Sequence, residues 1–406
     1  MRGLDADVLI AGGGLAAQRC CETLRREGHE GTITILCAEQ SRPYDRPVLS
    51  KSVLLGTGPG RELEFRPEAW YGEQGVRLEL GTSAVGLDPA TRTVTVMRAG
   101  RPGGRLRYGR LVIATGARPR SLAGLAPGGR LHELRTREDA GSLREALAAR
   151  GGRLAVIGAG LIGMEVASAA RARGLEVTLL EAGATPLERA LPASLGRWIA
   201  ELHRSQGVEV RLGRTVARAV PGPAAVRLSL DDGSRIEAQT VLVAAGSSPA
   251  TEWLAGSGLG AGMIQVDAAG RTALPGVFAA GDAASFPDPF LDANLPSQHW
   301  EAAVRQGTAV ARAILGRPQQ LPMPAMFWSD QHGRRIQMVG HAPAPCSIEF
   351  EGSPLRGEPF AARISGPRGP AAVLLVDRPD LLPGARRWVA DALITPEPQG
   401  VPRCPT

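Results

Sequence analysis

The chain has 406 residues, of which 43% are hydrophobic and 21% charged, and its formal net charge is +7. This length predicts two or three domains, because single hydrophobic cores stop growing at roughly 250–300 residues. The sequence lacks an apolar run long enough for a transmembrane helix, a basic run with the interleaved aromatic residues of nucleic-acid-binding proteins, and a CxxC spacing that would suggest a metal cluster or a redox-active dithiol.

The chain begins with a strand pattern and lacks the apolar segment and cleavage site of a secretory signal, so we expect a cytoplasmic protein.

The segment ADVLIAGGGLAAQRCCETLRREG predicts a strand and a helix joined by Gly12-x-Gly14-x-x-Ala17. The first glycine of such a turn permits a tight bend, the second lets the backbone approach a pyrophosphate, and the small third residue lets the helix pack on the strand. The helix N-terminus then presents a partial positive charge to the phosphates.

The next motif is PYDRPVLSK, which ends in Lys51, the only lysine among 47 basic residues. One reason to retain a lysine in so arginine-rich a chain is a place where a compact ammonium group fits and a planar guanidinium does not. At this point two interpretations stay open: Lys51 belongs to a site, or one lysine falls here by chance.

A second fingerprint follows in GRLAVIGAGLIGMEVASAARARGLEVTLLEA, as Gly158-x-Gly160-x-x-Gly163. Its second predicted strand ends in Glu181, about 20 residues after the fingerprint, where an acid binds the hydroxyl pair of a ribose. Two fingerprints predict two bound dinucleotides.

Three shorter strings connect the two halves. YGRLVIATGARPR leads a strand into Thr115-Gly116, and VLVAAGSSPATEWL leads another into Gly246, so both glycines are expected where the chain crosses between domains. GVFAAGDAASFP predicts a strand, a tight turn at Gly281, and Asp282, whose carboxylate could accept a hydrogen bond from a ribityl hydroxyl.

With these motifs the sequence resembles the NADH-dependent ferredoxin and rubredoxin reductases that serve oxygenases, relatives of the apoptosis-inducing factor. The resemblance covers nearly the whole chain and includes LRTREDA, HWEAAVRQG and FWSDQHGRRIQMVG. It implies an α/β fold with two Rossmann-like dinucleotide-binding domains and a C-terminal α+β domain. The implied boundaries are 1–112 with 245–320 for FAD, 113–244 for NAD, and 321–406 for the C-terminal domain, in which GARRWVADALI is a candidate amphipathic helix.

The resemblance also assigns residues to FAD. These are Gly12, Gly14, Ala16, Arg46, Lys51, Ala84, Arg135, Asp282 and Trp300. The family usually has an acid that binds the adenosine ribose where this chain has Ala38, so either the adjacent Glu39 takes that role or the contact is lost. The family also usually has Glu where this chain has Gln298, which keeps the hydrogen-bonding reach and loses the charge.

On the nicotinamide side the resemblance implies another set of contacts. These are Gly158, Gly160, Ile162, Gly163, Glu165, Glu181 and Gly246. It places Glu165 beside the nicotinamide and bridges it to Lys51, whose ammonium would lie near flavin N5 and stabilise negative charge. Because no arginine follows Glu181 closely, we expect NADH to be preferred over NADPH.

The implied reaction is hydride transfer from NADH to FAD, followed by two single-electron transfers to a small acidic iron–sulfur protein, a ferredoxin or rubredoxin, docked on arginines. We expect no metal site, no nucleic-acid or membrane partner, and a monomer or weak homodimer. Two alternatives stay open: a flavin NADH oxidase or monodehydroascorbate-type reductase, and a slow NADH-sensing flavoprotein.

Overall fold

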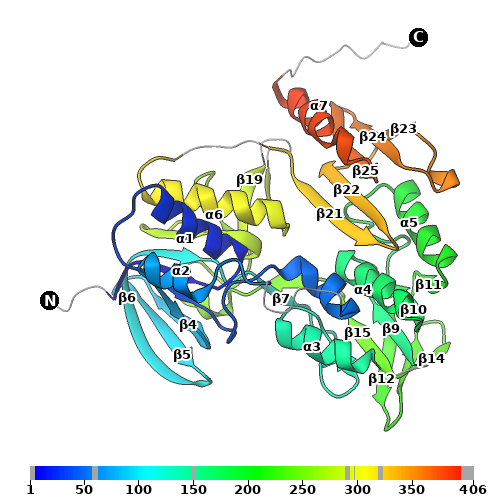
Figure 1. Cartoon of the computed structure of the whole chain (residues 1–406), viewed down its shortest axis with the longest axis horizontal. Coiled ribbons are helices and arrows are strands. Elements are labelled where there is room, and N and C mark those ends of the chain that lie inside the picture. The colour runs from blue at the N-terminus through cyan, green and yellow to red at the C-terminus, as the bar shows by residue number, and fades with distance from the viewer. Residues whose placement is uncertain are drawn as a thin grey trace.

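The computed structural model describes residues 5–56, 63–148, 152–288, 293–296, 298–318 and 323–394. Figure 1 shows three groups of elements, each built on its own β-sheet. The first two sheets are largely parallel and carry helices, and the third is antiparallel. The predicted α/β class, with two Rossmann-like folds and a C-terminal α+β part, is therefore confirmed. The domain boundaries stay a prediction.

The first sheet combines strands between residues 6 and 113 with a strand much later in the chain, because β18 pairs with β6. Its central strands are buried apolar runs, as expected for parallel strands covered on both faces. Its strands are β1 (Ala6–Ala11), β2 (Ile33–Leu36), β3 (Val76–Glu79), β4 (Thr82–Asp88), β5 (Thr93–Arg98), β6 (Arg101–Ile113) and β18 (Val277–Ala279).

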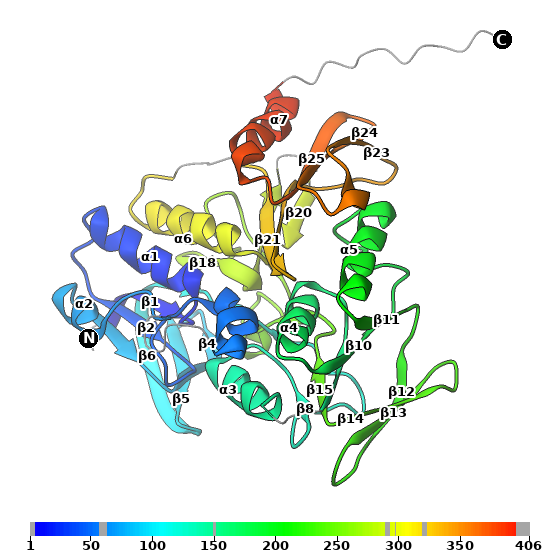
Figure 2. The ribbon, with the colours of Figure 1, turned by 45° about the vertical axis from the view of Figure 1, so that its right-hand side comes forward.

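Helices α1 (Leu15–Arg26) and α6 (Trp300–Ile314) lie side by side in both views (Figures 1 and 2). A Cβ atom at Gly307 would lie 2.4 Å from the carbonyl oxygen of Ala16, so the glycine permits this close approach. The contact holds the middle of α6 against the first turn of α1, where the first glycine fingerprint ends. The short helix α2 (Glu68–Glu73) lies beside β3.

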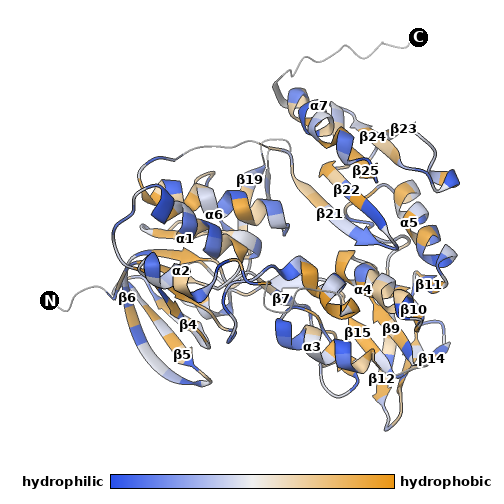
Figure 3. Ribbon diagram, viewed as in Figure 1, coloured by the Kyte–Doolittle hydropathy of each residue, from blue (hydrophilic) through white to orange (hydrophobic). Residues whose placement is uncertain are grey.

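The second sheet has the spatial order β11, β10, β9, β15, β8, and all its neighbouring strands are parallel. Figure 3 shows its central strands as largely hydrophobic, in agreement with their burial. Its strands are β8 (Leu131–His132), β9 (Arg153–Ile157), β10 (Glu176–Glu181), β11 (Val208–Leu212) and β15 (Thr240–Val243). Its helices are α3 (Arg137–Ala146), α4 (Leu161–Ala172) and α5 (Ala193–Ser205), and an antiparallel sheet follows of β12 (Val216–Pro221), β13 (Val226–Leu230) and β14 (Arg235–Ala238).

Two short antiparallel strands carry the chain between these sheets, β7 (Ala117–Pro119) and β16 (Ser247–Pro249). Gly116 and Gly246 precede them with φ of +71° and +99°, a conformation that favours glycine. The Thr115 hydroxyl donates to the Ala250 carbonyl at 2.7 Å, which ties the two crossings together.

Smaller elements complete the first group. These are the 3₁₀ turns η1 (Arg46–Val48), η3 (Glu252–Leu254) and η4 (Gly281–Ala283), the π-helical turn η2 (Leu49–Val53), and the strands β17 (Ile264–Gln265), β19 (Ala284–Asp288) and β20 (Ala293–Pro296).

The third sheet has the order β21, β22, β25, β24, β23 and is antiparallel throughout. One face packs on the second group, where Trp198 of α5 meets Phe360 edge to face at 5.0 Å. The predicted amphipathic helix is α7 (Leu382–Ile394), whose Ala385 and Val389 pack on the other face of this sheet, so that prediction is confirmed. The remaining elements are β21 (Met326–Gln331), β22 (Arg334–Gly340), β23 (Ser347–Glu351), η5 (Pro354–Arg356), β24 (Phe360–Gly366), β25 (Gly369–Val376) and η6 (Pro379–Leu381). Among the described residues, no helix has both the length and the apolar character needed to cross a membrane.

Candidate functional site

The first glycine fingerprint forms the predicted turn between β1 and α1. Gly12 has φ +123°, and a Cβ there would lie 2.0 Å from the Ala114 carbonyl oxygen, so only glycine fits. Gly14 precedes the helix, and a Cβ there would meet no atom within 4 Å. The space before the α1 N-terminus is therefore open to a pyrophosphate. Ala16 and Ala17 are buried on the first turn of the helix.

The second fingerprint repeats this geometry between β9 and α4. Gly158 has φ +107°, and its Cβ would lie 2.4 Å from the Ala244 carbonyl oxygen. A Cβ at Gly163 would lie 2.0 Å from the carbonyl oxygen of Gly158, whereas one at Gly160 would meet no atom within 4 Å. The residues at both turns thus fit a dinucleotide phosphate, each with an open middle glycine at a helix N-terminus.

Glu181 ends β10, as predicted, and faces the second turn. Its Oε2 accepts from the Ala159 amide at 2.7 Å, and its Oε1 accepts from the Gly183 amide at 2.8 Å. The carboxylate is therefore fixed at the place where an acid binds a ribose hydroxyl pair.

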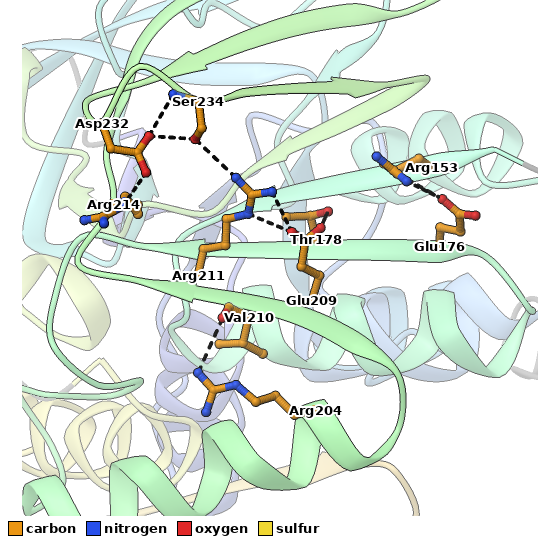
Figure 4. Close-up of polar contacts among 10 residues, drawn as sticks. All are labelled: Arg153, Glu176, Thr178, Arg204, Glu209, Val210, Arg211, Arg214, Asp232 and Ser234. Carbon is orange, nitrogen blue, oxygen red and sulfur yellow. Dashed lines mark hydrogen bonds and ion pairs between the residues drawn. The ribbon is translucent and has the colours of Figure 1, made fainter.

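Two arginines lie near the end of β10, which the sequence around Glu181 alone did not indicate: Arg211 of β11 is paired with Leu180, and Arg214 follows that strand. The Arg214 amide donates to the Glu181 carbonyl at 2.9 Å. Its guanidinium, however, donates to Asp232 at 2.8 Å, and Arg211 is bound by Glu209 and Ser234 (Figure 4). Both cations are thus already paired with groups of the protein.

A cavity lies between the two fingerprints and encloses about 1200 Å³, including its open mouth. The residues that line it come from all three groups of elements. They are Gly14, Leu15, Ala16, Tyr44, Asp45, Arg46, Pro47, Leu49, Ser50, Lys51, Ala114, Gly116, Leu134, Arg135, Leu161, Ile162, Glu165, Gly281, Asp282, Gln298, His299, Trp300, Ala303, Phe327 and Trp328.

An ion pair between Lys51 and Glu165 lies in the wall of this cavity. Lys51 Nζ is 2.7 Å from Glu165 Oε2, and the Glu165 side chain is only 5% exposed. The Ser50 hydroxyl donates to the same oxygen at 2.5 Å, and Ser329 of β21 donates to Oε1 at 2.6 Å. Lys51 and Ser50 lie in the single π-helical turn η2, a conformation frequent at functional sites.

Arg46 and Glu39 form a second charged group. Arg46 lies 2.5 Å from Glu39 Oε1, and the Tyr44 hydroxyl donates to Glu39 Oε2 at 2.6 Å. Burial raises the pKa of Tyr44, so the phenol keeps the proton that it donates. Both oxygens of Glu39 are therefore engaged by protein groups. Arg46 also donates to the Arg135 carbonyl at 2.6 Å.

Asp282 of η4 faces Arg135, whose guanidinium donates to its carboxylate at 3.0 Å. Trp300, at the start of α6, donates its indole proton to Asp45 at 2.8 Å and meets the Trp328 ring edge to face at 5.8 Å. These contacts fix five polar or aromatic side chains around the cavity.

Gln298 and His299 precede α6. Gln298 accepts a hydrogen bond from Ser247 of β16 at 3.0 Å, so this residue links α6 to a crossing strand. His299 stacks on Phe327 at 5.2 Å, and burial lowers its pKa to about 4, so its imidazole is neutral at pH 7.

The structure brings together about half of the predicted site residues in this cavity. Those that line it are Gly14, Ala16, Arg46, Lys51, Gly116, Arg135, Ile162, Glu165, Gly281, Asp282 and Trp300. Those outside the lining are Gly12, Ala17, Glu39, Ala84, Thr115, Gly158, Gly160, Gly163, Glu181 and Gly246. Most of the residues outside the lining belong to the turns, the crossings or the second fingerprint. Ala84 lies on β4 and is partly buried against the hydrophobic core of the first sheet.

The sequence analysis assigned no role to several lining residues. Tyr44, Asp45 and Ser50 lie in the PYDRPVLSK motif, and Phe327 and Trp328 lie in FWSDQ, so both motifs contained a signal. His299 opens the HWEAAVRQG motif, so it too stood beside a signal, although the sequence analysis assigned a role only to the adjacent Gln298 and Trp300.

The model of the pyridine nucleotide-disulphide oxidoreductase family matches residues 6–307. The ferredoxin–NAD(+) reductase component of the anthranilate 1,2-dioxygenase system of Burkholderia cepacia is 34% identical, over 96% of this chain and 95% of its own length. That of the biphenyl dioxygenase system of Paraburkholderia xenovorans is 39% identical, over 87% of this chain and 85% of its own.

A solved structure extends the similarity to the C-terminal part of the chain. The covalent complex of putidaredoxin reductase with putidaredoxin contains a chain with 30% identity and a TM-score of 0.89, matched over 96% of this chain and 94% of that one. Together with the paired fingerprints and the cavity between them, these matches show that the chain belongs to the pyridine nucleotide-disulphide oxidoreductase family.

Proposed function

We propose that the protein is an FAD-dependent NADH:ferredoxin oxidoreductase that supplies electrons to an oxygenase through a small iron–sulfur protein. The observation that carries this proposal is the Lys51–Glu165 pair, in a cavity bounded by both fingerprints, since it joins the two expected cofactor sites. The relatives named above, which are reductase components of dioxygenase systems, support the same function.

The residues that would hold FAD come mainly from the first group of elements, which we propose to be residues 1–112 and 245–320. Gly12, Gly14 and Ala16 would bind its pyrophosphate at the α1 N-terminus, and Asp282 would accept a hydrogen bond from its ribityl chain. The Glu39 carboxylate, engaged by Tyr44 and Arg46, orients Arg46 at the cavity.

NADH would bind to the second group, proposed as residues 113–244, with residues 321–406 as the C-terminal domain. Gly160 and its helix N-terminus would face the pyrophosphate, and Glu181 would bind the ribose hydroxyls. Ile162 is 43% exposed and lines the cavity beside Glu165, where an apolar side chain can support a nicotinamide ring.

When bound, FAD supplies the conversion of a two-electron hydride donor into one-electron steps. The protein's task is to position the rings and to set the charge around them. Lys51 provides a positive charge that can stabilise negative charge developing on the flavin, and Glu165 fixes its ammonium group.

The proposed partner is an acidic ferredoxin or rubredoxin, since the chain has a net charge of +7. We further propose a cytoplasmic monomer or weak homodimer.

The test of the proposed function is the reduction of an acidic ferredoxin or rubredoxin by the FAD-loaded protein and NADH at increasing ionic strength. The rate should fall as the Debye length shrinks to about 8 Å at physiological salt, whereas ferricyanide reduction should change less. Fast turnover of oxygen or a quinone, without salt-sensitive reduction of any iron–sulfur protein, would instead indicate an oxidase or a small-molecule reductase.

A further inference from the structure

Glu165 is the last acceptor in a buried chain of hydrogen bonds. Ser329 Oγ lies 2.6 Å from Glu165 Oε1, and Gln331 Nε2 lies 2.9 Å from Ser329 Oγ. Gln331 Oε1 lies 2.9 Å from His203 Nε2, and His203 Nδ1 lies 3.1 Å from His332 Nε2. Ser329, Gln331 and His203 are at most 1% exposed.

The chemistry of these groups gives the chain one direction. A carboxylate only accepts, so Ser329 donates to Glu165, and Ser329 in turn accepts from the Gln331 amide nitrogen. The Gln331 amide oxygen also only accepts, so His203 carries its proton on Nε2. Burial lowers the pKa of His203 and lowers that of His332 to about 4, so both rings are neutral at pH 7. His203 Nδ1 is then an acceptor, and every proton in the chain points toward the Glu165 carboxylate.

The chain also connects the three groups of elements. Ser50 and Lys51 bind Glu165 Oε2 from the first group, Glu165 belongs to the second, and Ser329 binds Oε1 from the third. Each oxygen of the carboxylate is thus held from a different side.

The far end of the chain is fixed as well. His332 lies at the tip of the β21–β22 hairpin with φ +50°, and its amide donates to Ser168 Oγ of α4 at 2.7 Å. The hairpin that carries Ser329 and Gln331 is therefore bound to the same helix that carries Glu165.

We propose that Ser329, Gln331 and His203 are positioning residues that fix the orientation of the Glu165 carboxylate, with Oε2 on Lys51 and Oε1 held by Ser329. Without the Ser329 donor, Oε1 would be a buried acceptor without a partner, and the carboxylate would turn toward the ammonium group of Lys51. It would then neutralise Lys51 more completely and weaken the charge available to the flavin. This inference rests on the proposed function, because it concerns the same ion pair.

The first experiment uses the FAD-loaded full-length protein, anaerobic stopped-flow bleaching of the flavin by NADH, and a redox titration. Ser329→Ala should lower the bleaching rate about tenfold, since hydrogen bonds to charged groups are among the strongest, and shift the flavin midpoint potential to more negative values. FAD content and the NADH dissociation constant should stay unchanged. Ser329→Thr, which keeps the hydroxyl, should restore most of the rate and the potential.

The matched control is Ser257→Ala, which removes an equally buried hydroxyl that donates to the Leu254 carbonyl away from the cavity. It should leave the rate and the potential as in the wild type, even where it lowers the thermal unfolding midpoint as much as Ser329→Ala does. A Ser329→Ala protein that matches the Ser257→Ala protein in rate and potential would overturn the inference.

A second pair of variants tests whether the effect comes from the chain behind Ser329. His203→Gln keeps an amide donor for Gln331 and should retain the potential, whereas His203→Phe removes it and should shift the potential in the same direction as Ser329→Ala. Equal potentials in both His203 variants would remove His203 from the positioning set. The inference and the proposed function fail differently. A wrong function leaves a wild-type flavin that NADH reduces but that passes no electrons to any iron–sulfur protein, whereas a wrong inference leaves equally fast bleaching in wild type and Ser329→Ala.

Discussion

The ammonium group of Lys51 lies 2.7 Å from the carboxylate of Glu165, and the two residues come from different groups of elements, the turn η2 of the first and the helix α4 of the second. Lys51 also donates to the Pro47 carbonyl at 3.1 Å, so the position of its charge is fixed by both groups. The only lysine of the chain therefore stands at the contact between the two predicted cofactor sites.

Lys51→Met should leave FAD bound but lower the flavin potential and the rate of flavin reduction by NADH. One fixed charge lost at this place should cost on the order of 2–4 kcal/mol of transition-state stabilisation, as for other preorganised groups. Lys51→Arg should restore only part of the rate, because a planar guanidinium must displace Glu165 or the nicotinamide. Anaerobic stopped-flow kinetics and a redox titration of both variants measure this, and wild-type values in both would mean that Lys51 has no role at the flavin.

NADH should be preferred over NADPH by at least ~10-fold in kcat/KM, since a misplaced charge at the ribose is worth more than about 1.4 kcal/mol. The physical reason is the fixed carboxylate of Glu181, together with the pairing of Arg214 by Asp232. Steady-state kinetics with both coenzymes and a saturating acceptor check this. Equal efficiency would contradict the assignment of Glu181 to the ribose.

Asp232→Asn should release the guanidinium of Arg214, a residue whose amide donates to the Glu181 carbonyl, and reduce the preference for NADH severalfold by improving the kcat/KM for NADPH. The matched control is Asp231→Asn, the neighbouring acid, which accepts from the Thr215 amide and does not bind this guanidinium in the structure. If the two variants have the same coenzyme ratio, Arg214 does not reach the 2′-position even when it is free.

The free energy of unfolding should fall on acidification because burial lowers the pKa of His299 to about 4. A histidine whose folded-state pKa lies below its unfolded value of about 6.5 favours the folded state only while it is neutral, so stability is lost as pH falls from about 6.5 and the loss is complete below about 4. His299→Phe, which keeps a ring to stack on Phe327, should reduce this loss by about 1–3 kcal/mol. Thermal unfolding of both proteins from pH 7 to pH 4 at saturating FAD is the measurement, and parallel curves would mean that His299 does not contribute.

The sequence predicted the parts of the fold that depend on local rules. The two strand–turn–helix units, the crossings at Gly116 and Gly246 and the helix α7 follow from glycine chemistry and apolar periodicity, which act over a few residues. The Lys51–Glu165 pair was expected only from a family resemblance, because no local rule joins distant residues.

Other parts of the site depend on packing and could not be predicted in this way. Arg214 approaches Glu181 only because β11 pairs in parallel with β10, and Ser329 reaches Glu165 only because the third sheet packs on the second group. The burial that makes His299 neutral likewise arises only in the folded protein, where its ring stacks on Phe327 of the third sheet. These relationships depend on tertiary contacts, which a single sequence does not display.

The paired crossing strands have a consequence for protein engineering. Because β7 and β16 are hydrogen-bonded neighbours, the segment between Gly116 and Gly246 leaves and re-enters the rest of the chain at adjacent points. Its two ends therefore suit domain exchange. A related segment whose ends have the same spacing could replace it without lengthening either connection. Such a chimera would combine altered coenzyme use with an unchanged flavin-binding part.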